Sequence, residues 1–226
     1  MSKTFEVQYD KYVNEAETSG FETLGLMSSQ SWRKDPKHLL FYLSRYKFVA
    51  KMFSGLNSVL EVGCGDGFAS RIVRQSVVNL TLTDIDPVFL ADIKRRTCSS
   101  WPVETLLNDY FIGPIQNKEY DGIYSLDVLE HIPAEKDELF LQNIVKNLTA
   151  TGVMIIGVPN LESLAYASED SKVGHINLMS QKKLKHKLEK FFNNVFIFSM
   201  NDEVVHTGFY AMSHYNFALC ANQKRY

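Results

Sequence analysis

Three glycines at alternate positions, Gly63, Gly65 and Gly67, follow a short apolar run. Glycine lets the backbone approach a ligand closely, because it has no Cβ and tolerates positive φ. The residues after the turn, 68–74, read as a helix whose first N–H groups would point at the same place. A dinucleotide fingerprint has its third glycine one residue later, and here an acid, Glu61, stands two residues before the first glycine. The turn therefore favours a nucleotide-type ligand other than a dinucleotide.

A carboxylate follows the next expected strand, 79–83. Asp84 stands at the carboxyl end of this strand, where an acid can accept both hydroxyls of a ribose. Asp86 competes for this role, but Asp86 and Pro87 together have the chemistry of a helix start. We therefore assign Asp84 to a ribose and Asp86 to a helix N-cap, and Ile85 between them would pack against an adenine base.

Strands and helices alternate from residue 58 onward, which predicts an α/β fold with a mostly parallel, doubly wound sheet. Near the end of the chain, two strands follow one another without a clear helix between them. They read as an antiparallel pair at the sheet edge, so the last strand should be antiparallel. The seven expected strands are 58–62, 79–83, 103–106, 120–125, 153–157, 194–199 and 213–220. The expected helices are 67–76, 87–97, 134–148 and one that Ser180 caps.

The first part of the chain, residues 1–55, predicts an N-terminal helical cap or lid. Asp35 and Pro36 form an N-cap followed by proline at the first helical position, and apolar residues then recur at helical spacing over 39–53 before Gly55. Added elements of this kind often close a site against water. The alternative is that they serve only as packing for the sheet.

The composition is that of a globular protein. A chain of 226 residues is most simply one domain with a sizeable core, and its net charge of -2 gives no positive field that would attract nucleic acid. Three scattered cysteines do not make a disulfide framework or a zinc site. The sequence contains no secretory signal and no apolar run long enough to span a bilayer. We therefore expect a cytoplasmic monomer or homodimer with no nucleic-acid partner, no membrane span and no metal.

Several segments together resemble the class I S-adenosylmethionine-dependent methyltransferases. Residues 61–67, which read E-V-G-C-G-D-G, are similar to the first motif of that family. Residues 120–132, Y-D-G-I-Y-S-L-D-V-L-E-H-I, and residues 152–160, G-V-M-I-I-G-V-P-N, resemble the fourth and fifth strand segments of the small-molecule O-methyltransferases of ubiquinone biosynthesis. The resemblance covers about residues 40–221. It implies a Rossmann-like methyltransferase domain over 56–226, with S-adenosyl-L-methionine as the cofactor.

The resemblance also implies roles for single residues. It places Arg45 against the methionine carboxylate of the cofactor, and the end of the fourth strand, Leu126, against the methionine ammonium. Asn108 and Asp109 stand where these methyltransferases contact the adenine amino group, although an Asx turn would explain them as well. The remaining expected cofactor contacts are Glu61, Gly63, Cys64, Gly65, Gly67, Asp84 and Ile85.

A methyl sulfonium is already activated by its positive charge, so the main tasks of such an enzyme are to align the reactants and to exclude water. A hydroxyl acceptor must also lose its proton, which a histidine can accept near neutral pH. His131 and His175 are the candidate bases, and the alternative is that each only makes hydrogen bonds within the fold. Tyr9 and Tyr12 are candidates for lining the acceptor pocket.

These features predict methyl transfer from S-adenosylmethionine to a small molecule, with a hydroxyl oxygen as the favoured acceptor, in quinone-type or cell-surface polysaccharide biosynthesis. The alternatives are a small-molecule N-methyltransferase and a methyltransferase-like binding protein without activity. The intact Glu61 and Asp84 disfavour an inactive protein, and the glycine spacing with the segment 129–131 disfavours a nicotinamide-dependent dehydrogenase. Residues 125–128 lack the Asn-Pro-Pro-aromatic quartet of enzymes that methylate adenine or protein amides.

Overall fold

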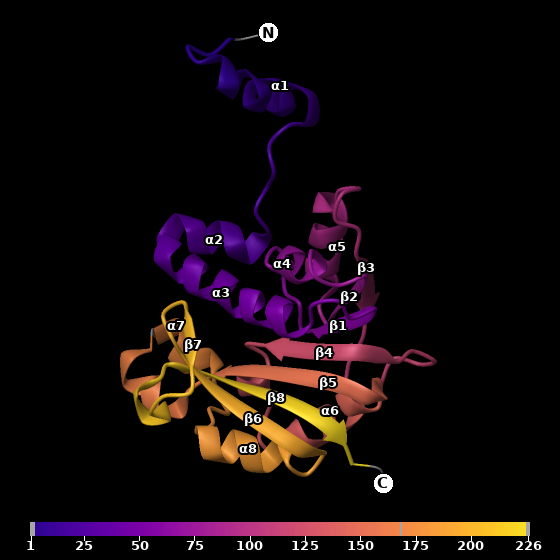
Figure 1. Ribbon diagram of the computed structural model, residues 1–226. Helices are drawn as coiled ribbons and strands as arrows, with labels where there is room; N and C mark the ends of the chain where they lie inside the picture. Colours follow the sequence, from indigo (N-terminus) through magenta and orange to yellow (C-terminus); the bar gives the residue numbers. More distant parts are fainter. Residues whose placement is uncertain (1–2, 168, 225–226) are drawn as a thin grey trace.

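The computed structural model describes residues 3–167 and 169–224, which form one eight-stranded sheet with helices on both faces (Figure 1). The expected cap, 1–55, and the expected methyltransferase domain, 56–226, begin and end at residues 1 and 226, which lie outside the described residues. The strands are β1 (Ser58–Val62), β2 (Asn79–Asp84), β3 (Glu104–Leu107), β4 (Tyr120–Leu126), β5 (Leu148–Pro159), β6 (Phe192–Asn201), β7 (Val204–His206) and β8 (Tyr215–Gln223).

The strand order in the sheet is β3-β2-β1-β4-β5-β8-β6-β7. The strands β1 to β5 pair in parallel, whereas β8 runs antiparallel to both β5 and β6. The order reverses between β1 and β4, because β2 and β3 extend the sheet to one side and β5 to the other. Ligands of open α/β sheets bind outside the carboxyl ends of the strands at such a reversal. The topology therefore points to the ends of β1 and β4.

The helices occupy the N-terminal segment and the connections between strands. Helix α3 begins as expected, because Asp35 accepts a hydrogen bond from the N–H of His38 at 3.3 Å. None of the described helices is both long and apolar enough to cross a membrane. The α-helices are α1 (Asp10–Ser19), α2 (Leu26–Lys34), α3 (Pro36–Met52), α4 (Ser70–Arg74), α5 (Pro87–Arg96), α6 (Asp137–Val145), α7 (Glu169–Gly174) and α8 (Gln181–Leu188). The 3-10 helices are η1 (Val7–Tyr9), η2 (Leu129–His131), η3 (Leu161–Tyr166) and η4 (Tyr210–Met212).

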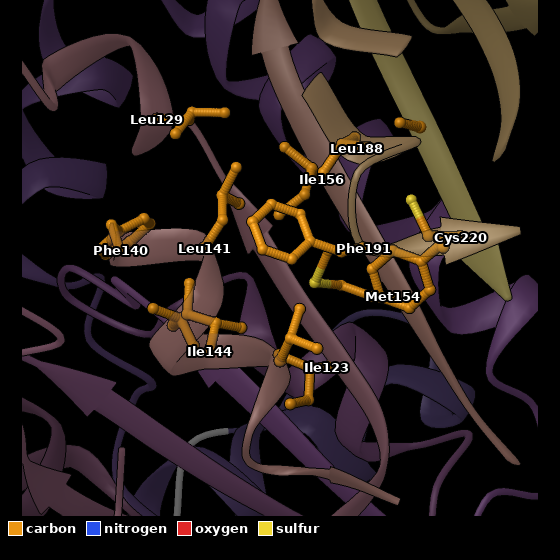
Figure 2. Packing of buried hydrophobic residues seen from close by; sticks show 14 of the residues in the cluster. Ile123, Leu129, Phe140, Leu141, Ile144, Met154, Ile156, Leu188, Phe191 and Cys220 are labelled. Carbon is orange, nitrogen blue, oxygen red and sulfur yellow. The ribbon is translucent and has the colours of Figure 1, made fainter. Parts of the chain in front are cut away.

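Two apolar clusters hold the three layers together. Because successive strand residues point to opposite faces, Ile123 of β4 joins one cluster and Tyr124 the other. The first cluster packs the sheet against α6 and α8, and Figure 2 shows Phe140, Leu141 and Ile144 of α6 facing the sheet residues. The second packs the other face against α3, α4 and α5 through Tyr46, Val49, Phe53, Val73, Leu90 and Ile93. These clusters hold the strand ends, and hence the site, in a fixed position.

The expected α/β fold with a mostly parallel sheet and an antiparallel last strand is confirmed. The expected strand count was wrong by one, because β7 adds a short edge strand against β6. The expected antiparallel pair is present as β6 and β8, with β8 inserted between β5 and β6 and β7 outermost. Three residues of β7 carry too little periodicity to be recognised, and the insertion of β8 depends on pairing between distant segments.

The N-terminal part differs from a uniform cap. None of the ten described residues of α1 is buried, and Figure 1 shows this helix standing off the rest of the molecule at the end of an extended connection. In contrast, α2 and α3 lie against the body of the protein, where α3 contributes Tyr46, Val49 and Ala50 to the core. The part of the expected cap that contacts the domain therefore consists of α2 and α3.

Candidate active site

The glycine turn begins where β1 ends, and its three glycines have positive φ angles of 75° at Gly63, 51° at Gly65 and 61° at Gly67. Residues with a side chain rarely adopt such angles. The N–H of Gly63 donates to the carbonyl of Thr83 at 2.8 Å, which ties the turn to the end of β2. A Cβ on Gly63 would lie 2.4 Å from Cγ2 of Val128, just beyond β4. Both the backbone angles and the close packing therefore require glycine here.

Asp84 is held at the end of β2 by two main-chain donors. Its carboxylate accepts hydrogen bonds from the N–H groups of Gly65 and Asp86, each at 2.9 Å. Asp86 in turn accepts from the N–H of Val88 at 2.9 Å and caps α5, which confirms its assignment as an N-cap. Ile85 beside them is 66% exposed. Because a carboxylate offers about four lone-pair positions, Asp84 can hold the glycine turn and still accept ribose hydroxyls.

Glu61 lies in the core beneath the turn and not at its surface. Its carboxylate, 1% exposed, accepts hydrogen bonds from the hydroxyls of Tyr46 at 2.8 Å, Tyr124 at 2.6 Å and Ser70 at 2.5 Å. Burial raises the pKa of Glu61 to about 7, although the three hydrogen bonds act in the opposite direction. The expected contact between Glu61 and the cofactor thus differs from the structure, where this side chain joins α3, α4 and β4 under the turn.

The raised pKa of Glu61 makes stability depend on pH. The carboxyl binds its proton more tightly in the folded state, so its contribution to stability is complete below its ordinary pKa of 4.5 and is lost as pH rises through about 7. A shift of this size corresponds to about 3 kcal/mol. The free energy of unfolding of Glu61→Gln should therefore improve relative to wild type by about that amount between pH 4.5 and pH 8, as measured by denaturant unfolding.

Glu104→Gln is the matched control for this prediction. The hydrogen bond from Lys118 lowers the pKa of Glu104, so its contribution to stability is present above its ordinary pKa and is lost as pH falls. Its difference from wild type should therefore stay flat between pH 4.5 and pH 8. If Glu61→Gln gave the same flat difference, the buried carboxyl would not titrate in this range.

Arg45 lies at the centre of an ionic cluster next to the turn. Its NH1 group donates to both carboxylate oxygens of Asp127 at 2.7 Å, and its guanidinium carbon lies 4.1 Å from the centre of the Tyr215 ring. Burial acts to lower the pKa of Arg45, but the charge and hydrogen bonds of Asp127, together with the nearby Tyr215 and Glu130, raise the net pKa. Asp127, directly after β4, has a positive φ of 57°. A methionine carboxylate placed against Arg45 would therefore share the guanidinium with Asp127.

A cavity of about 920 Å³ opens at this end of the sheet. Three of the expected site residues, Arg45, His131 and His175, line it, and so does Asp127. Some of its lining comes from α2 and α3, and some from the segments that follow β5 and β7 and from the start of β8. The helices contribute Met27, Ser28, Ser31, His38, Phe41 and Tyr42, and the later segments contribute Leu164, Tyr166, Met212, His214 and Tyr215.

His131 and His175 lie together on the cavity wall, with their ring centres 5.0 Å apart. Nδ1 of His131 lies 2.8 Å from the carbonyl oxygen of Gly174. Burial lowers the pKa of His175, and the neighbouring His131 lowers it further. Glu130, 1% exposed, completes the group: one ligand atom each from Glu130, His131 and His175 lie within 4.8 Å of one another. The structure thus brings both expected histidines into one place.

The buried Glu130 is electrostatically unusual. Neither carboxylate oxygen has a hydrogen-bond partner among the described residues. Burial raises the pKa of Glu130 well above its ordinary value, and the charge of Asp127 raises it further. A buried carboxyl in this situation is either protonated or paired with a cation. Together with the two histidines it forms a group that could hold a metal ion, and our expectation of no metal stays a prediction.

Asn108 and Asp109 lie where the end of β3 meets the end of β2, because the N–H of Asn108 donates to the carbonyl of Asp84 at 3.2 Å. The carboxylate of Asp109 accepts from the N–H of Phe111 at 2.8 Å, which is the Asx turn considered as the alternative. A contact between these residues and adenine stays a prediction.

The remaining expected residues have mixed positions. The side chains of Cys64 and Leu126 are buried, so each would present its main chain to a ligand. Tyr9 and Tyr12 lie in η1 and α1, 50% and 57% exposed, and are not among the described residues that line the cavity. The structure does not bring these tyrosines to the acceptor cavity, because α1 points away from it (Figure 1).

The sequence interpretation did not single out Asp127, Glu130 or Tyr215 as site residues. The sequence could have pointed to Asp127 and Glu130, because both are close to His131 in the segment D-V-L-E-H, directly after a strand. Tyr215 had no such local signal, because β8 brings it to Arg45 from the far end of the chain.

Comparisons with known protein sequences agree with the geometry of the site. Residues 60–154 match the sequence profile of a methyltransferase domain family. The mitochondrial ubiquinone biosynthesis O-methyltransferase of Schizosaccharomyces pombe is 23% identical over 146 residues, which are 59% of this chain and 52% of that protein. An uncharacterised methyltransferase of Mycobacterium tuberculosis is 31% identical over 78 residues, 34% of this chain and 39% of that protein. The chain thus spans about half the length of the first relative and less of the second.

Solved structures show the same fold. The N-methyltransferase NodS of Bradyrhizobium japonicum, in complex with S-adenosylhomocysteine, superposes with a TM-score of 0.64 at 18% identity, over 84% of this chain and 91% of that one. The magnesium protoporphyrin IX methyltransferase of Synechocystis, with bound S-adenosylmethionine, gives a TM-score of 0.56 at 12% identity, over 98% and 100% of the two chains. The expected Rossmann-like methyltransferase fold is confirmed.

Proposed function

We propose that this class I S-adenosylmethionine-dependent methyltransferase transfers its methyl group to a hydroxyl oxygen of a small molecule, in quinone-type or cell-surface polysaccharide biosynthesis. The observation that supports an oxygen acceptor best is the hydrogen bond at 2.8 Å between Nδ1 of His131 and the carbonyl of Gly174. Because a carbonyl can only accept, Nδ1 must carry the proton, and Nε2 of the neutral ring keeps its lone pair. A ring oriented in this way can take the proton that a hydroxyl loses on methylation.

His175 supports the same assignment from the other side of the pair. Its lowered pKa favours the neutral imidazole, so an uncharged ring lies beside His131 at the cavity wall. A neutral imidazole can accept a proton, whereas a charged one cannot. An amine acceptor would need less help from a base, and N-methylation is therefore the alternative that the histidine variants test.

We place the cofactor across the carboxyl ends of β1, β2 and β4. The glycine turn would approach its ribose and methionine parts, with Asp84 accepting the ribose hydroxyls and Ile85 against the adenine. The methionine end would point toward Arg45 and the main chain of Leu126. Helices α2 and α3 would act as the cap, since both line the cavity that adjoins the turn.

The far wall of the cavity suggests what kind of acceptor fits. Leu164, Tyr166 and Met212 line it and are 38%, 91% and 76% exposed. Solvent-exposed apolar side chains that gather at a cavity mouth commonly mark a binding surface. We therefore propose an acceptor with an apolar body that rests on these side chains and a hydroxyl that reaches His131.

A second candidate for activating the acceptor is a divalent cation held by Glu130, His131 and His175. The unpartnered, buried carboxylate of Glu130 favours it, because a cation would supply the missing charge. Such an ion would lower the pKa of a hydroxyl near it. In this arrangement His131 and His175 would be metal ligands. The lone pair on Nε2 of His131 would then coordinate the metal and could not accept a proton.

Binding of S-adenosylhomocysteine is the first test of the proposed function. At a hundredfold excess over its dissociation constant it should stabilise the fold by about 2.7 kcal/mol, measured as a thermal shift and by calorimetry. NAD at the same concentration is the control and should leave the melting temperature unchanged. A shift with NAD and none with S-adenosylhomocysteine would contradict the cofactor assignment. A panel of hydroxyl and amine acceptors, assayed with S-adenosylmethionine, then distinguishes O- from N-methylation.

A further inference from the structure

Helix α2 begins without a capping side chain of its own. Its N-cap residue is Gly25, which has no side chain to offer, and its first turn, 26–28, contains no acidic residue. The first N–H groups of a helix need an acceptor from outside the helix. At nine residues, α2 is also shorter than helices that are stable on their own. Its first turn must therefore be stabilised by another part of the protein.

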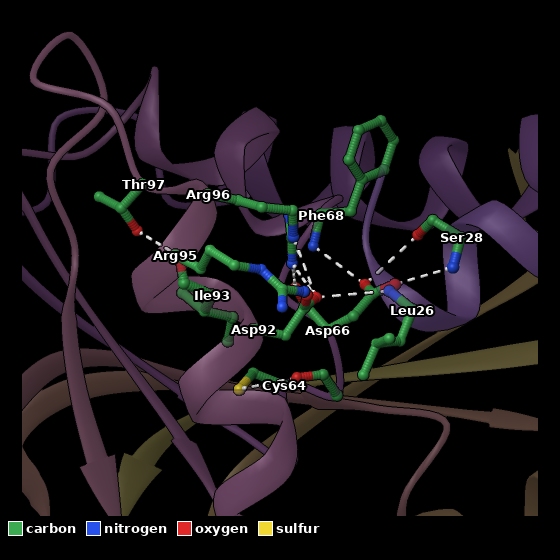
Figure 3. A network of polar contacts seen from close by, with 11 residues as sticks. Leu26, Ser28, Cys64, Asp66, Phe68, Asp92, Ile93, Arg95, Arg96 and Thr97 are labelled. Carbon is green, nitrogen blue, oxygen red and sulfur yellow. Dashed lines mark hydrogen bonds and ion pairs between the residues drawn. The ribbon is translucent and has the colours of Figure 1, made fainter. Parts of the chain in front are cut away.

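Asp66, between Gly65 and Gly67 of the glycine turn, supplies the missing cap. Its carboxylate accepts from the N–H of Ser28 at 2.7 Å and from the hydroxyl of Ser28 at 3.3 Å. Figure 3 shows the Asp66 carboxylate between Ser28 on one side and Phe68 on the other; the N–H of Phe68 donates to it at 3.1 Å. One carboxylate thus accepts from Ser28 in the first turn of α2 and from a main-chain donor of the glycine turn, while the N–H of Leu26 donates to Asp92 at 3.4 Å. Asp66 is 1% exposed, so water does not compete for these bonds.

The basic residues near Asp66 do not neutralise its carboxylate. Arg96 donates to the main-chain oxygen of Asp66 and forms an ion pair at 2.8 Å with Asp92. Asp92 also pairs with Arg95 at 2.5 Å. Within the described part of the chain, the Asp66 carboxylate makes its hydrogen bonds with Ser28 and Phe68. Its charge is therefore directed at the start of α2, where the helix dipole favours an anion.

Gly25 and Asp66 are complementary in shape. A Cβ on Gly25 would lie 2.3 Å from Cγ and from Oδ2 of Asp66, a distance at which one of the two residues must move. The carboxylate thus occupies the space in which an ordinary N-cap side chain would begin. Helix α2 is therefore capped by a residue of the cofactor turn and not by its own N-cap residue.

The first turn of α2 also lies directly over the cofactor turn. Sδ of Met27 would be 3.1 Å from a Cβ built on Gly65, and Met27, Ser28 and Ser31 line the cavity. Asp66 is therefore the hydrogen-bonded link between the residues expected to hold the cofactor and the helix that covers them.

We propose that Asp66 is a positioning residue that couples the conformation of the cofactor turn to the order of α2. The inference rests on the proposed function only in taking S-adenosylmethionine as the ligand of the turn. When the cofactor fixes the turn, the carboxylate of Asp66 is fixed with it and α2 is capped over the ligand. When α2 is not capped, Met27 and Ser28 do not cover the turn, and the cofactor exchanges with solvent more rapidly.

The test compares amide hydrogen exchange of residues 26–34 with and without S-adenosylhomocysteine in wild type, Asp66→Ala and Asp66→Asn. In wild type the ligand should slow exchange in α2. In Asp66→Ala this protection should disappear, and the dissociation constant of the ligand should rise roughly tenfold, the ratio that corresponds to a helix N-cap of about 1.4 kcal/mol. Asp66→Asn keeps an acceptor oxygen and should rescue most of both effects. KM for S-adenosylmethionine should rise in Asp66→Ala while kcat at saturation stays near wild type.

Two further variants make the test specific. Gly25→Ala should have the same effects as Asp66→Ala, because its Cβ displaces the carboxylate, and it should have no further effect in an Asp66→Gly background. If Asp66→Ala does not fold, Gly25→Ala and Asp66→Asn carry the test. Ser180→Ala is the matched control, since it removes the N-cap of α8, where Ser180 accepts from the N–H of Lys183 at 3.3 Å, away from the cofactor turn. It should leave ligand affinity unchanged.

The outcomes separate this inference from the proposed function. If S-adenosylhomocysteine binds wild type without protecting α2, or protects α2 equally in Asp66→Ala, the coupling is wrong although the methyltransferase assignment stands. If wild type does not bind S-adenosylhomocysteine, the proposed function itself fails. Protection that is lost in Asp66→Ala and Gly25→Ala, and kept in Asp66→Asn and Ser180→Ala, supports the coupling.

Discussion

His131→Ala is expected to lower kcat by roughly 10²–10⁴-fold, the usual contribution of a general base, while the affinity for S-adenosylhomocysteine stays nearly unchanged. The reason is that His131 lies on the cavity wall with Nδ1 committed to Gly174, so that Nε2 is the proton acceptor. Steady-state kinetics with an accepted hydroxyl substrate measure this effect.

His131→Gln is the matched variant for this prediction. Its amide N–H₂ can still donate to Gly174, so the local structure is kept, but it cannot act as a base. It should therefore be as slow as His131→Ala, and His175→Ala should be milder. If His175→Ala loses activity and His131→Ala does not, the base assignment is reversed. If all three stay active, the acceptor is already nucleophilic, as an amine is.

A chelator distinguishes the base from the second candidate, a divalent cation. If Glu130, His131 and His175 hold a cation, EDTA should abolish turnover, added Mg²⁺ or Mn²⁺ should restore it, and Glu130→Gln should be as inactive as His131→Ala. If His131 acts as a base, EDTA should have no effect. Glu130→Gln should then keep most of the activity, because an amide resembles the protonated carboxyl that burial favours.

Gly65→Val should weaken the binding of S-adenosylhomocysteine by at least about 100-fold, which corresponds to about 2.7 kcal/mol. Two penalties combine at this position. A β-branched residue is strained at the observed φ of 51°, and a Cβ would lie 3.1 Å from Sδ of Met27 and push the first turn of α2 away. The added side chain would also stand between the backbone and the ligand. Isothermal titration calorimetry measures the change.

Gly55→Val separates backbone strain from damage to the site. Gly55 has a φ of 85°, and among the described residues no atom lies within 4 Å of the position of its Cβ. This variant should therefore lose stability in the same way, while its affinity for the ligand stays close to wild type. Normal binding by Gly65→Val would show that the turn is not the cofactor site.

The sequence alone was sufficient for the parts of this protein that depend on local patterns. The positions of β1, β2 and β4 follow from short apolar runs that end in glycine or an acid, and the N-caps Asp35 and Asp86 follow from the proline after each. The glycine spacing, the acid at 84 and the segment 120–132 together carried the resemblance to the class I methyltransferases. All of these signals lie within a few residues of one another, where the allowed backbone angles and local hydrogen bonds limit what the chain can do.

The tertiary structure decided the roles of individual side chains, because a role depends on which distant groups surround an atom. Glu61 belongs to the motif, yet three hydroxyls from other elements place it in the core. Arg45 meets Asp127 and Tyr215 only because α3, β4 and β8 converge at one end of the sheet. Asp66 caps a helix that begins far earlier in the chain, and neither Gly25 nor Asp66 shows this alone. Contacts of this kind arise from packing between elements, for which a single sequence carries no local pattern.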